Sequence, residues 1–298
     1  MVAIADTVAA PPRRPRNATW HFFSRLFREK PLGAFGFVVC VIFLFCGVFA
    51  DVLAPYGFNQ ISPMNRLKPP GEKFWLGTDN LGRDMLSRTL YGAQLSVIIG
   101  MSAAALATFI SVLIGILCGY LGGKVDMLLQ RFVDAWMSFP DLIILIVVVS
   151  VVGPGMGPVI VILGLLYGIA GSRIIRGAVL SVRENAYVHA AQSTGATLPR
   201  ILWKHILPNV MAPVIVLFTT RVGAVILAES GLAFLGLGVP PPAPTWGGML
   251  SGSGRSFMYL APWLALAPGL CITIVVYAIN VFGDALRDLL DPRMRGSR

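Results

Sequence analysis

The sequence contains very little charge. Asp, Glu, Lys and Arg make up 13% of the 298 residues, whereas hydrophobic residues make up 56%. A soluble domain has about 25% charged residues, because its surface must interact with water. Apolar side chains can face lipid instead, so a membrane protein does not need that polar surface. The shortage of charge therefore excludes an ordinary soluble protein and indicates one that lies in a membrane.

Cysteine and histidine are also scarce. The cysteines all stand in apolar stretches, which argues against a disulfide framework; they are Cys40, Cys46, Cys118 and Cys271. The histidines fall in more polar segments, so we expect no metal cluster inside the membrane; they are His21, His189 and His205. The first 30 residues are polar and basic, without a short apolar core before a cleavage site. We therefore expect an uncleaved anchor instead of a cleavable signal peptide.

Long stretches without charge are abundant. Roughly 20 residues of helix cross a bilayer, and each stretch is long enough: 31–50, 89–123, 142–172, 205–228 (where Arg221 is the only charge) and 256–283. Stretch 142–172 is too long for one upright helix, and its Gly/Pro-rich run 153–158 predicts a turn. We therefore predict six spans, at 32–54, 94–120, 134–152, 158–174, 209–228 and 262–283.

The basic residues lie mainly between these spans. With both termini cytoplasmic, 17 of the 24 Lys and Arg residues fall on the cytoplasmic side and 6 on the other. If 142–172 were one span, 9 would be inside and 14 outside. The positive-inside rule favours the first arrangement. We predict an all-α polytopic membrane protein with six transmembrane helices, both termini cytoplasmic, and no binding of nucleic acid, which needs a basic soluble face.

These spans divide the chain into four parts. We expect the Ala/Pro/Arg-rich start over 1–17 to be disordered, and an aromatic and basic run follows it over 20–30. That run predicts an interfacial amphipathic helix, with a simple basic flank as the alternative. The parts are 1–31, a cytoplasmic tail with the interfacial helix; 32–93, the first transmembrane helix and an extracytoplasmic loop; 94–284, five helices with a cytoplasmic loop at 173–208; and 285–298, a cytoplasmic tail.

Glycine marks both helix contacts and turns. Small residues at four-residue spacing predict close helix packing, as in Gly115/Gly119/Gly123 and Gly164/Gly168. In the run 76–84, two glycines bracket Thr, Asp and Asn, which indicates a tight, ordered loop. The Gly/Pro-dense run 231–248 cannot form a long regular helix, and we expect it to fold back over the outer mouth of the bundle.

The cytoplasmic segment 173–208 is the most informative part of the chain. Ala190 and Ala191 give a short helix a small side that fits a partner's groove. Gly195 can end that helix in a left-handed conformation, and Pro199 suits the first turn of a second helix. Pro208 interrupts the path into the next span. We predict a helix, a glycine turn and a second helix lying along the membrane surface.

This segment resembles the loop shared by permease subunits of bacterial ABC importers, in which Ala-Ala is followed three residues later by Gly and then by Leu-Pro. In that family the loop is the coupling helix that docks into the ATP-hydrolysing subunit. The resemblance assigns this role to Tyr187, His189, Ala190, Ala191, Gly195, Ala196, His205, Leu207 and Pro208. His189 stands where Glu is usual and His205 where Ile is usual, but the run 205–209 is similar to the peptide/nickel branch.

Further runs are similar to the same branch. They are 76–84 (Leu-Gly-Thr-Asp-x-x-Gly-Arg-Asp), 229–247 (Glu-x-x-Leu-x-Phe-Leu-Gly-Leu-Gly, then Pro and Trp-Gly) and 288–293. They include the outer-loop residues Asp79, Gly82, Arg83, Asp84, Gly236, Gly238 and Trp246. Together the matches span 30–295 and imply a type I ABC importer permease fold, in the second, shorter-looped permease of a pair.

The resemblance implies partners: a sister permease, two ATP-binding subunits and an extracytoplasmic solute-binding protein, in the bacterial inner membrane. The chain itself has no phosphate-binding loop, since its nearest run has Cys118 for the first Gly and Val125 after Lys124. We expect it to be no enzyme and to bind no cofactor, with ATP–Mg on the partner subunits. The expected solutes are dipeptides and oligopeptides; nickel chelates or another small solute are the alternative.

Arg221 stands in the middle of a span, where an arginine costs roughly 2.5–3.5 kcal/mol on insertion scales. It either faces the substrate path and attracts a carboxylate, or forms a structural pair, for which Glu229 is a candidate. Asp134 and Asp141 are expected to be interfacial charges. A secondary transporter would need ionisable groups in several spans, and here Arg221 is nearly alone. An intramembrane enzyme would need a catalytic pair at membrane depth, which the sequence does not show. Both alternatives are therefore disfavoured.

Overall fold

The computed structural model describes residues 18–290, apart from the side chains of residues 18, 19 and 21. The expected disordered tail at 1–17 and the match at 291–293 lie outside these residues, as does the His21 side chain. Within the described range the chain is helical, with one isolated antiparallel bridge between Thr78 and Asp84. The all-α prediction is confirmed.

Five helices are each long and apolar enough to cross a membrane: α2 (Pro31–Val48), α4 (Met85–Leu121), α7 (Met156–Arg183), α10 (Met211–Phe234) and α13 (Trp263–Leu290). The pair α5 (Gly123–Met137) and α6 (Asp141–Val152), which meet at 86°, is a sixth candidate if it is one broken span and not a re-entrant loop. Shorter helices are α1 (Ala18–Glu29), α3 (Ala50–Leu53), α8 (Ala186–Ser193), α9 (Leu198–Ile201), α11 (Trp246–Met249) and α12 (Arg255–Phe257). Pro63–Asn65 and Leu207–Asn209 form 3-10 turns, and Leu202–Ile206 and Leu250–Gly254 form π turns.

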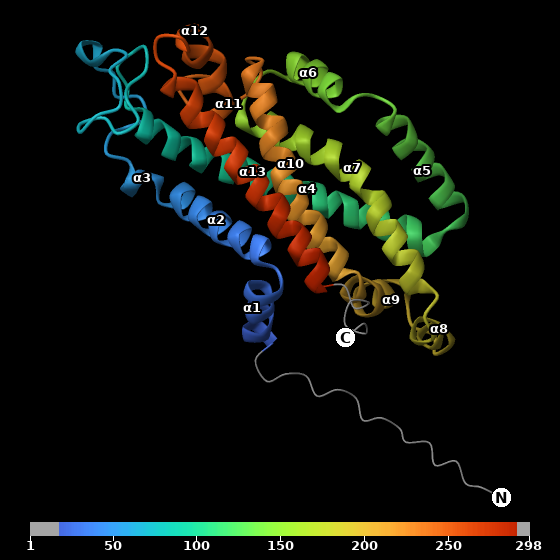
Figure 1. Ribbon diagram of the computed structural model, residues 1–298. Helices are drawn as coiled ribbons and strands as arrows, with labels where there is room; N and C mark the ends of the chain where they lie inside the picture. Colours follow the sequence, from blue (N-terminus) through green and yellow to red (C-terminus); the bar gives the residue numbers. More distant parts are fainter. Residues whose placement is uncertain (1–17, 291–298) are drawn as a thin grey trace, which may run out of the picture.

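The helices run up and down between two ends (Figure 1). The first, here called the α8–α9 end, also holds α1 and the last turn of α13. The opposite one, here called the α11–α12 end, holds α3, α6 and the loop that precedes α4. Helix α1 and the close of α13 therefore lie at the same end of the bundle.

The sequence located the spans better than their ends. The turn at 153–158 is confirmed, because α6 ends at Val152 and α7 begins at Met156. A continuous helix over 134–152 was wrong, since the chain bends sharply at Pro140, which has no backbone N–H and disfavours helical geometry at Phe139. Helix α4 begins nine residues before the predicted span, and α7 runs nine residues beyond its own.

Glycines bring α4 and α7 together. A Cβ at Gly115 would lie 2.7 Å from Cβ of Ile175, and one at Gly168 would lie 2.8 Å from Cβ of Ile110. Both are closer than packed side chains tolerate, so only glycine permits this approach, as the spacing predicted. Gly123 takes no part, because a Cβ there would meet nothing within 4 Å.

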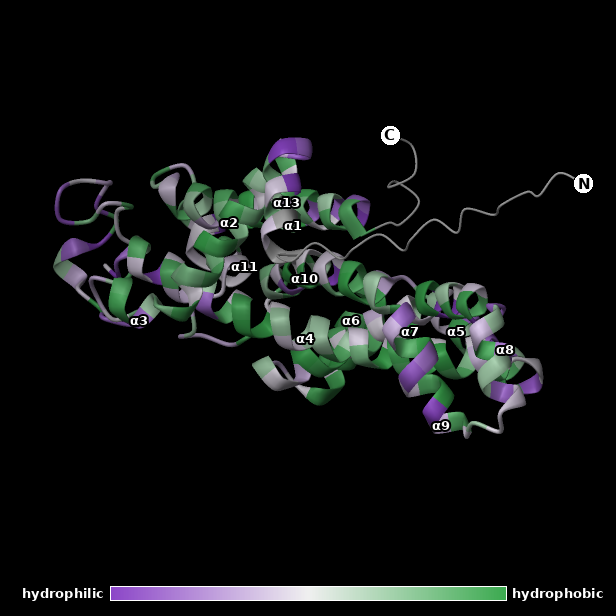
Figure 2. Cartoon of the chain, turned by 90° about the horizontal axis from the view of Figure 1, so that it is seen from below, coloured by the Kyte–Doolittle hydropathy of each residue, from purple (hydrophilic) through white to green (hydrophobic). Residues whose placement is uncertain are grey.

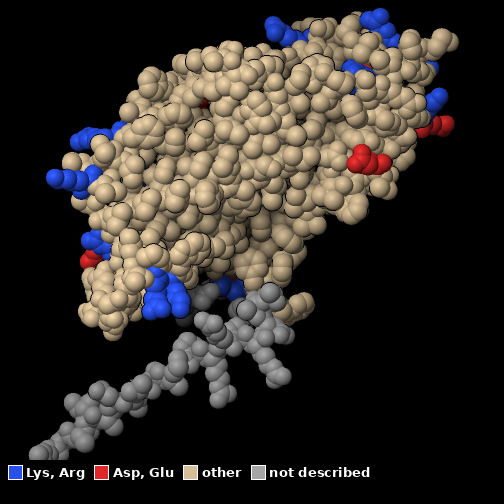
Figure 3. Space-filling model, turned by 180° about the vertical axis from the view of Figure 1, so that it is seen from behind, with Lys and Arg blue, Asp and Glu red and all other residues tan. Residues whose placement is uncertain are grey.

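The outer surface of the bundle is apolar. Many large hydrophobic side chains are exposed on the long helices, among them Phe109 of α4 at 65% and Val48 of α2 at 61%. Figure 2 colours the long helices mostly hydrophobic and concentrates hydrophilic residues in the end loops, α1, α8 and α9. On the face drawn in Figure 3, the charged side chains gather toward the two ends and leave a wide uncharged middle. This distribution suits a protein surrounded by lipid.

Candidate functional site

The segment between α7 and α10 adopts the predicted helix, glycine turn and helix. Helix α8 is followed by Gly195, whose φ of 74° is a left-handed conformation. The Gly195 N–H donates to the carbonyl of Gln192 at 2.9 Å, and the Ala196 N–H donates to that of Ala191 at 3.1 Å. These bonds close the helix in the way that a C-terminal glycine favours. Helix α9 then begins with a proline in its first turn.

One side of this loop is buried. Four apolar side chains on it are at most 3% exposed: Val188, Ile201, Ile206 and Val210. They share one cluster with residues from three long helices: Ile116 of α4, Ile175 and Val179 of α7, and Leu217 of α10. We call these eight residues the loop anchor. Any force on the loop therefore acts on three membrane-crossing helices together.

Tyr120, at the end of α4, adds polar contacts to the anchor. Its hydroxyl accepts a hydrogen bond from the Gln192 side chain at 3.0 Å, and its carbonyl accepts one from the Arg183 guanidinium at 3.1 Å. Helix α4 is thereby attached to both α7 and α8. The sequence gave no sign of this role, because Tyr120 lies far from the loop along the chain.

The other side of the loop is open and forms a hollow of about 370 Å³. Six of the nine residues assigned by resemblance lie on it; the full lining is Tyr187, Ala190, Ala191, Thr194, Gly195, Ala196, Arg200 and His205. The ring of His205 lies 6.3 Å from that of Tyr187. His189 is exposed but does not line the hollow, and Leu207 and Pro208 form the 3-10 turn before α10. The hollow can accept a protruding part of a partner.

Arg221 and Glu229 do not pair. They lie eight residues apart on α10, a rise of about 12 Å, which is beyond the reach of two side chains. The guanidinium of Arg221 instead lies 5.1 Å from the ring centre of Tyr167 on α7, a cation–π contact. Glu229 is 1% exposed, and its Oε1 has no hydrogen-bond partner among the described residues. The suggested structural partner of Arg221 was therefore the wrong residue.

Two aspartates of α5 are paired with arginines of α7. Asp126 of α5 accepts two hydrogen bonds from the Arg176 guanidinium, both at 2.6 Å. Asp134 of α5 forms an ion pair with Arg173 of α7. Among the described residues, no group of three His, Cys, Asp or Glu side chains could hold a metal ion.

The run 76–84 forms an ordered loop at the α11–α12 end, and hydrogen bonds within the loop hold it closed. Asp79 Oδ1 accepts hydrogen bonds from the backbone N–H groups of Leu81 and Arg83, at 2.8 and 2.9 Å. Asp79 Oδ2 accepts from Arg83 Nε at 2.7 Å and lies 3.7 Å from Arg88 Nε. Asp84 caps α4, because its carboxylate accepts from the Ser87 N–H at 2.7 Å.

Gly82 allows this loop to close. Its φ is 74°, and a Cβ there would lie 1.9 Å from the Ser62 carbonyl oxygen. A second loop completes the α11–α12 end: Trp246 is 2% exposed and donates its indole N–H to the Thr89 carbonyl at 3.0 Å. Gly236, with a φ of 82°, and Gly238, which lies against Ala233, turn the chain after α10. The run 231–248 therefore folds back onto α4 and α10.

The chain matches two family models. The model described as "Binding-protein-dependent transport system inner membrane component" matches residues 111–296. The model described as "N-terminal TM domain of oligopeptide transport permease C" matches residues 19–70. The first match includes the loop anchor and the hollow, and the second includes α1, α2 and α3.

Curated relatives match over nearly the whole chain. The dipeptide transport system permease protein DppC of Alkalihalophilus pseudofirmus is 37% identical over 276 residues, which is 93% of this chain and 90% of the relative. The oligopeptide transport system permease protein OppC of Bacillus subtilis is 37% identical, with 90% of this chain and 88% of the relative covered. The glutathione transport system permease protein GsiD of Escherichia coli is 37% identical, with 93% and 91% covered.

Proposed function

The chain belongs to the family of inner membrane components of binding-protein-dependent transport systems, and from this premise we propose that it is one of two permeases in an ATP-driven importer of dipeptides or oligopeptides. It is an ABC transporter permease of the bacterial inner membrane. The proposal adds a sister permease, two ATP-binding subunits and an extracytoplasmic solute-binding protein as partners. ATP–Mg is bound by the ATP-binding subunits, and both termini of this chain are cytoplasmic.

The loop anchor is the observation that supports coupling to a separate motor. Its buried side is fixed to α4, α7 and α10, whereas the open side presents small residues around a hollow. An ATP-binding subunit docks into that hollow, and closure of the two motors moves the loop as a rigid lever. Because α10 follows the loop directly, it tilts with it, and the path between the two permeases changes its access from one side to the other.

A crosslinking experiment tests the docking. The four native cysteines are replaced, and one cysteine is introduced at Ala190 in the assembled transporter. We expect a crosslink to an ATP-binding subunit that changes in yield when ATP is added. Met64 is 90% exposed at the opposite end, so Met64→Cys is the matched control and should form no such crosslink. If no position from 184 to 200 crosslinks, the coupling role is wrong.

The names of the relatives support peptides as the solute, since they describe permeases for dipeptides, oligopeptides and glutathione. Import of nickel chelates or another small solute by the same assembly is the alternative. Uptake in vesicles decides between a motor-driven importer and a secondary transporter. We expect peptide uptake to stop when the partner ATPase is inactivated and to continue when the membrane potential is collapsed; the opposite pattern would contradict the proposal.

Arg221 serves the substrate path in this proposal, where its charge attracts the carboxylate of a peptide. Its Nε is buried without a hydrogen-bond partner among the described residues, and its guanidinium lies over the Tyr167 ring. Replacing Arg221 with Met should reduce uptake while the complex still assembles, and Arg221→Lys should restore part of the uptake. Loss of assembly in Arg221→Met would instead assign Arg221 a structural role.

A further inference from the structure

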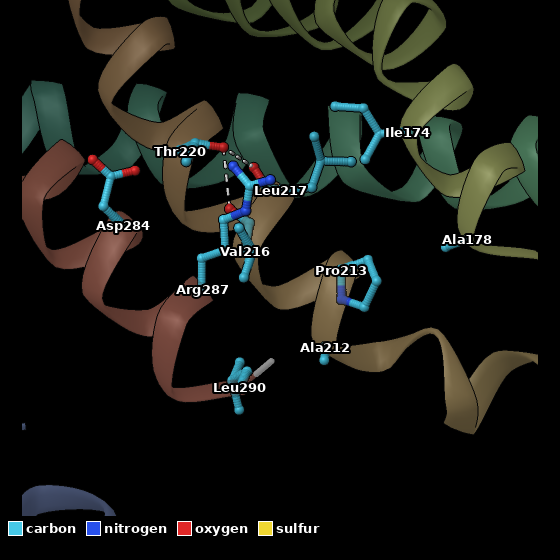
Figure 4. Close-up of a pocket in the computed structure, with 10 residues that line it drawn as sticks. All are labelled: Ile174, Ala178, Ala212, Pro213, Val216, Leu217, Thr220, Asp284, Arg287 and Leu290. Carbon is cyan, nitrogen blue, oxygen red and sulfur yellow. Dashed lines mark hydrogen bonds between the residues drawn. The ribbon is translucent and has the colours of Figure 1, made fainter. Parts of the chain in front are cut away.

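A groove of about 570 Å³ lies among α7, α10 and α13, toward the α8–α9 end (Figure 4). We call it the α10–α13 groove. Its walls are apolar apart from one hydroxyl and two charges; they comprise Ile174 and Ala178 of α7, Ala212, Pro213, Val216, Leu217 and Thr220 of α10, and Asp284, Arg287 and Leu290 of α13. This volume falls within the roughly 300–1,000 Å³ that is usual for sites of small ligands.

The two charges of the groove have opposite sign and make no ion pair within the described part of the chain. Neither Asp284 nor Arg287 makes a hydrogen bond or ion pair with another described residue, and both are exposed. Asp288, on the same helix, is paired with Lys30 at 2.5 Å. The dipole of α13 favours a cation near its C-terminal end, which accounts for Arg287 but disfavours Asp284. Helix stability therefore does not explain why both charges are present.

The spacing of the charges suits a short zwitterion. Side chains three residues apart on a helix have Cβ atoms about 5–6 Å apart, and two residues of extended peptide span about 7 Å. In Figure 4, Arg287 reaches from α13 toward the stretch of α10 that holds Thr220 and Val216. The Thr220 hydroxyl donates to the carbonyls of Val216 and Leu217, at 3.1 and 3.0 Å, so its oxygen is still free to accept.

We propose that the α10–α13 groove is a binding site for the charged ends of a short peptide, with Arg287 on the carboxylate and Asp284 on the ammonium group. The inference rests on the proposed function, and it adds a site to it. Arg221 is adjacent to Thr220 in sequence but contacts Tyr167 and does not line the groove. The groove is therefore a second site, closer to the α8–α9 end, through which a peptide passes on release.

An apolar covering fits this groove less well than a zwitterion does. A helix of a partner, or a lipid chain, would remove both charges from water and offer neither of them a hydrogen-bond partner, and desolvating charges is costly even when they pair with each other. A zwitterionic peptide brings one opposite charge for each. Its side chains, which differ between peptides, then lie against the apolar wall, so the site distinguishes free termini without distinguishing sequence.

Protection of a cysteine in the groove tests the proposal in the assembled transporter. With the native cysteines replaced, Ala212→Cys is labelled with a maleimide in the presence of Ala-Ala, N-acetyl-Ala-Ala or Ala-Ala-amide. We expect Ala-Ala to protect at concentrations about tenfold lower than either blocked form, as the loss of one charge-assisted hydrogen bond implies. Labelling at Met64→Cys should not respond to any of the three.

Two variants test which residue binds the carboxylate of the peptide and which binds its ammonium group. Arg287→Gln should abolish the advantage of Ala-Ala over its amide and preserve its advantage over the acetylated form, and Asp284→Asn should do the reverse. Asp288→Asn removes the same charge from the same helix outside the groove, so it should leave both ratios unchanged. A general loss of stability would lower protection by all three compounds together and would not produce this crossed pattern.

The failures can be told apart. Equal protection by the three compounds, or a cysteine that is labelled in the isolated chain but covered by the sister permease in the complex, would overturn the site. ATP-dependent uptake of Ala-Ala is measured in the same vesicles. Peptide uptake without the crossed pattern would contradict the binding site in the groove and leave the proposed function intact. Uptake of another solute, but of no peptide, would contradict the proposed substrate.

Discussion

The loops at the two ends of the bundle differ in how much of their surface is buried within the chain. At the α11–α12 end, Asp79 is surrounded by donors from its own chain, and Trp246 is buried with its N–H paired. At the α8–α9 end, the apolar side of the loop is buried, but its other side is open around Ala190. The loops of the α11–α12 end are thus closed by contacts within the chain. The loop of the α8–α9 end is buried on one side and exposed on the other, where we propose that an ATP-binding subunit docks.

Removing the Asp79 carboxylate should have the largest effect on stability. Its side chain is 1% exposed, and those of Arg83 and Arg88 are 12% and 9% exposed. Asp79→Ala leaves two partly buried cations uncompensated, so we expect a loss of about 3–5 kcal/mol. The fraction of chain that stays folded on heating in detergent measures this. Glu72, exposed in the same loop, provides the control Glu72→Ala. Equal stability of the two variants would show that the contacts of Asp79 do not stabilise the α11–α12 end.

A change in the loop anchor should have a smaller effect on stability and a distinct effect on coupling. Val188 is 0% exposed, and Val188→Ala removes two buried methyl groups, for about 2 kcal/mol. Val125 is 43% exposed, so Val125→Ala is the matched control. Because the loop is then held less tightly, we expect ATP hydrolysis by the complex to exceed what peptide uptake requires. An unchanged ratio of ATP hydrolysis to peptide uptake would contradict the proposal that the loop moves as a rigid lever.

The sequence predicted most of the fold, because uncharged stretches and glycine spacing are local signals. It placed the crossings and the turn at 153–158, and it identified Gly115 as a packing residue. It began the second span at 94, whereas α4 begins at Met85 and includes Arg88, which lies near Asp79. The break at Pro140 was missed because the apolar run 142–152 is too short to cross a bilayer alone, so the predicted span was extended back over Pro140.

The candidate sites were less accessible to sequence analysis. The resemblance identified the open side of the loop but not its anchor, since Ile116 and Val188 are 72 residues apart and look like ordinary apolar positions. The α10–α13 groove unites Thr220 with Asp284 and Arg287. Only the packing of α10 against α13 brings them together, and no local pattern marks such a meeting.

The smallest effect on stability should come from a substitution of Ala190. This substitution also tests most directly whether the exposed side of the loop binds a partner. Ala190 is exposed on α8, so Ala190→Arg should change the free energy of unfolding by less than about 0.5 kcal/mol. A long cation in the hollow nevertheless occupies the space in which we place the ATP-binding subunit. We therefore expect a folded chain that assembles with its sister permease, no longer retains the ATP-binding subunits on purification, and transports no peptide. Ala190→Ser, which adds one small atom, should retain both properties. If Ala190→Arg still binds the motor and transports, the open side of the loop is not where the motor docks, and the difference between the two ends must have another cause.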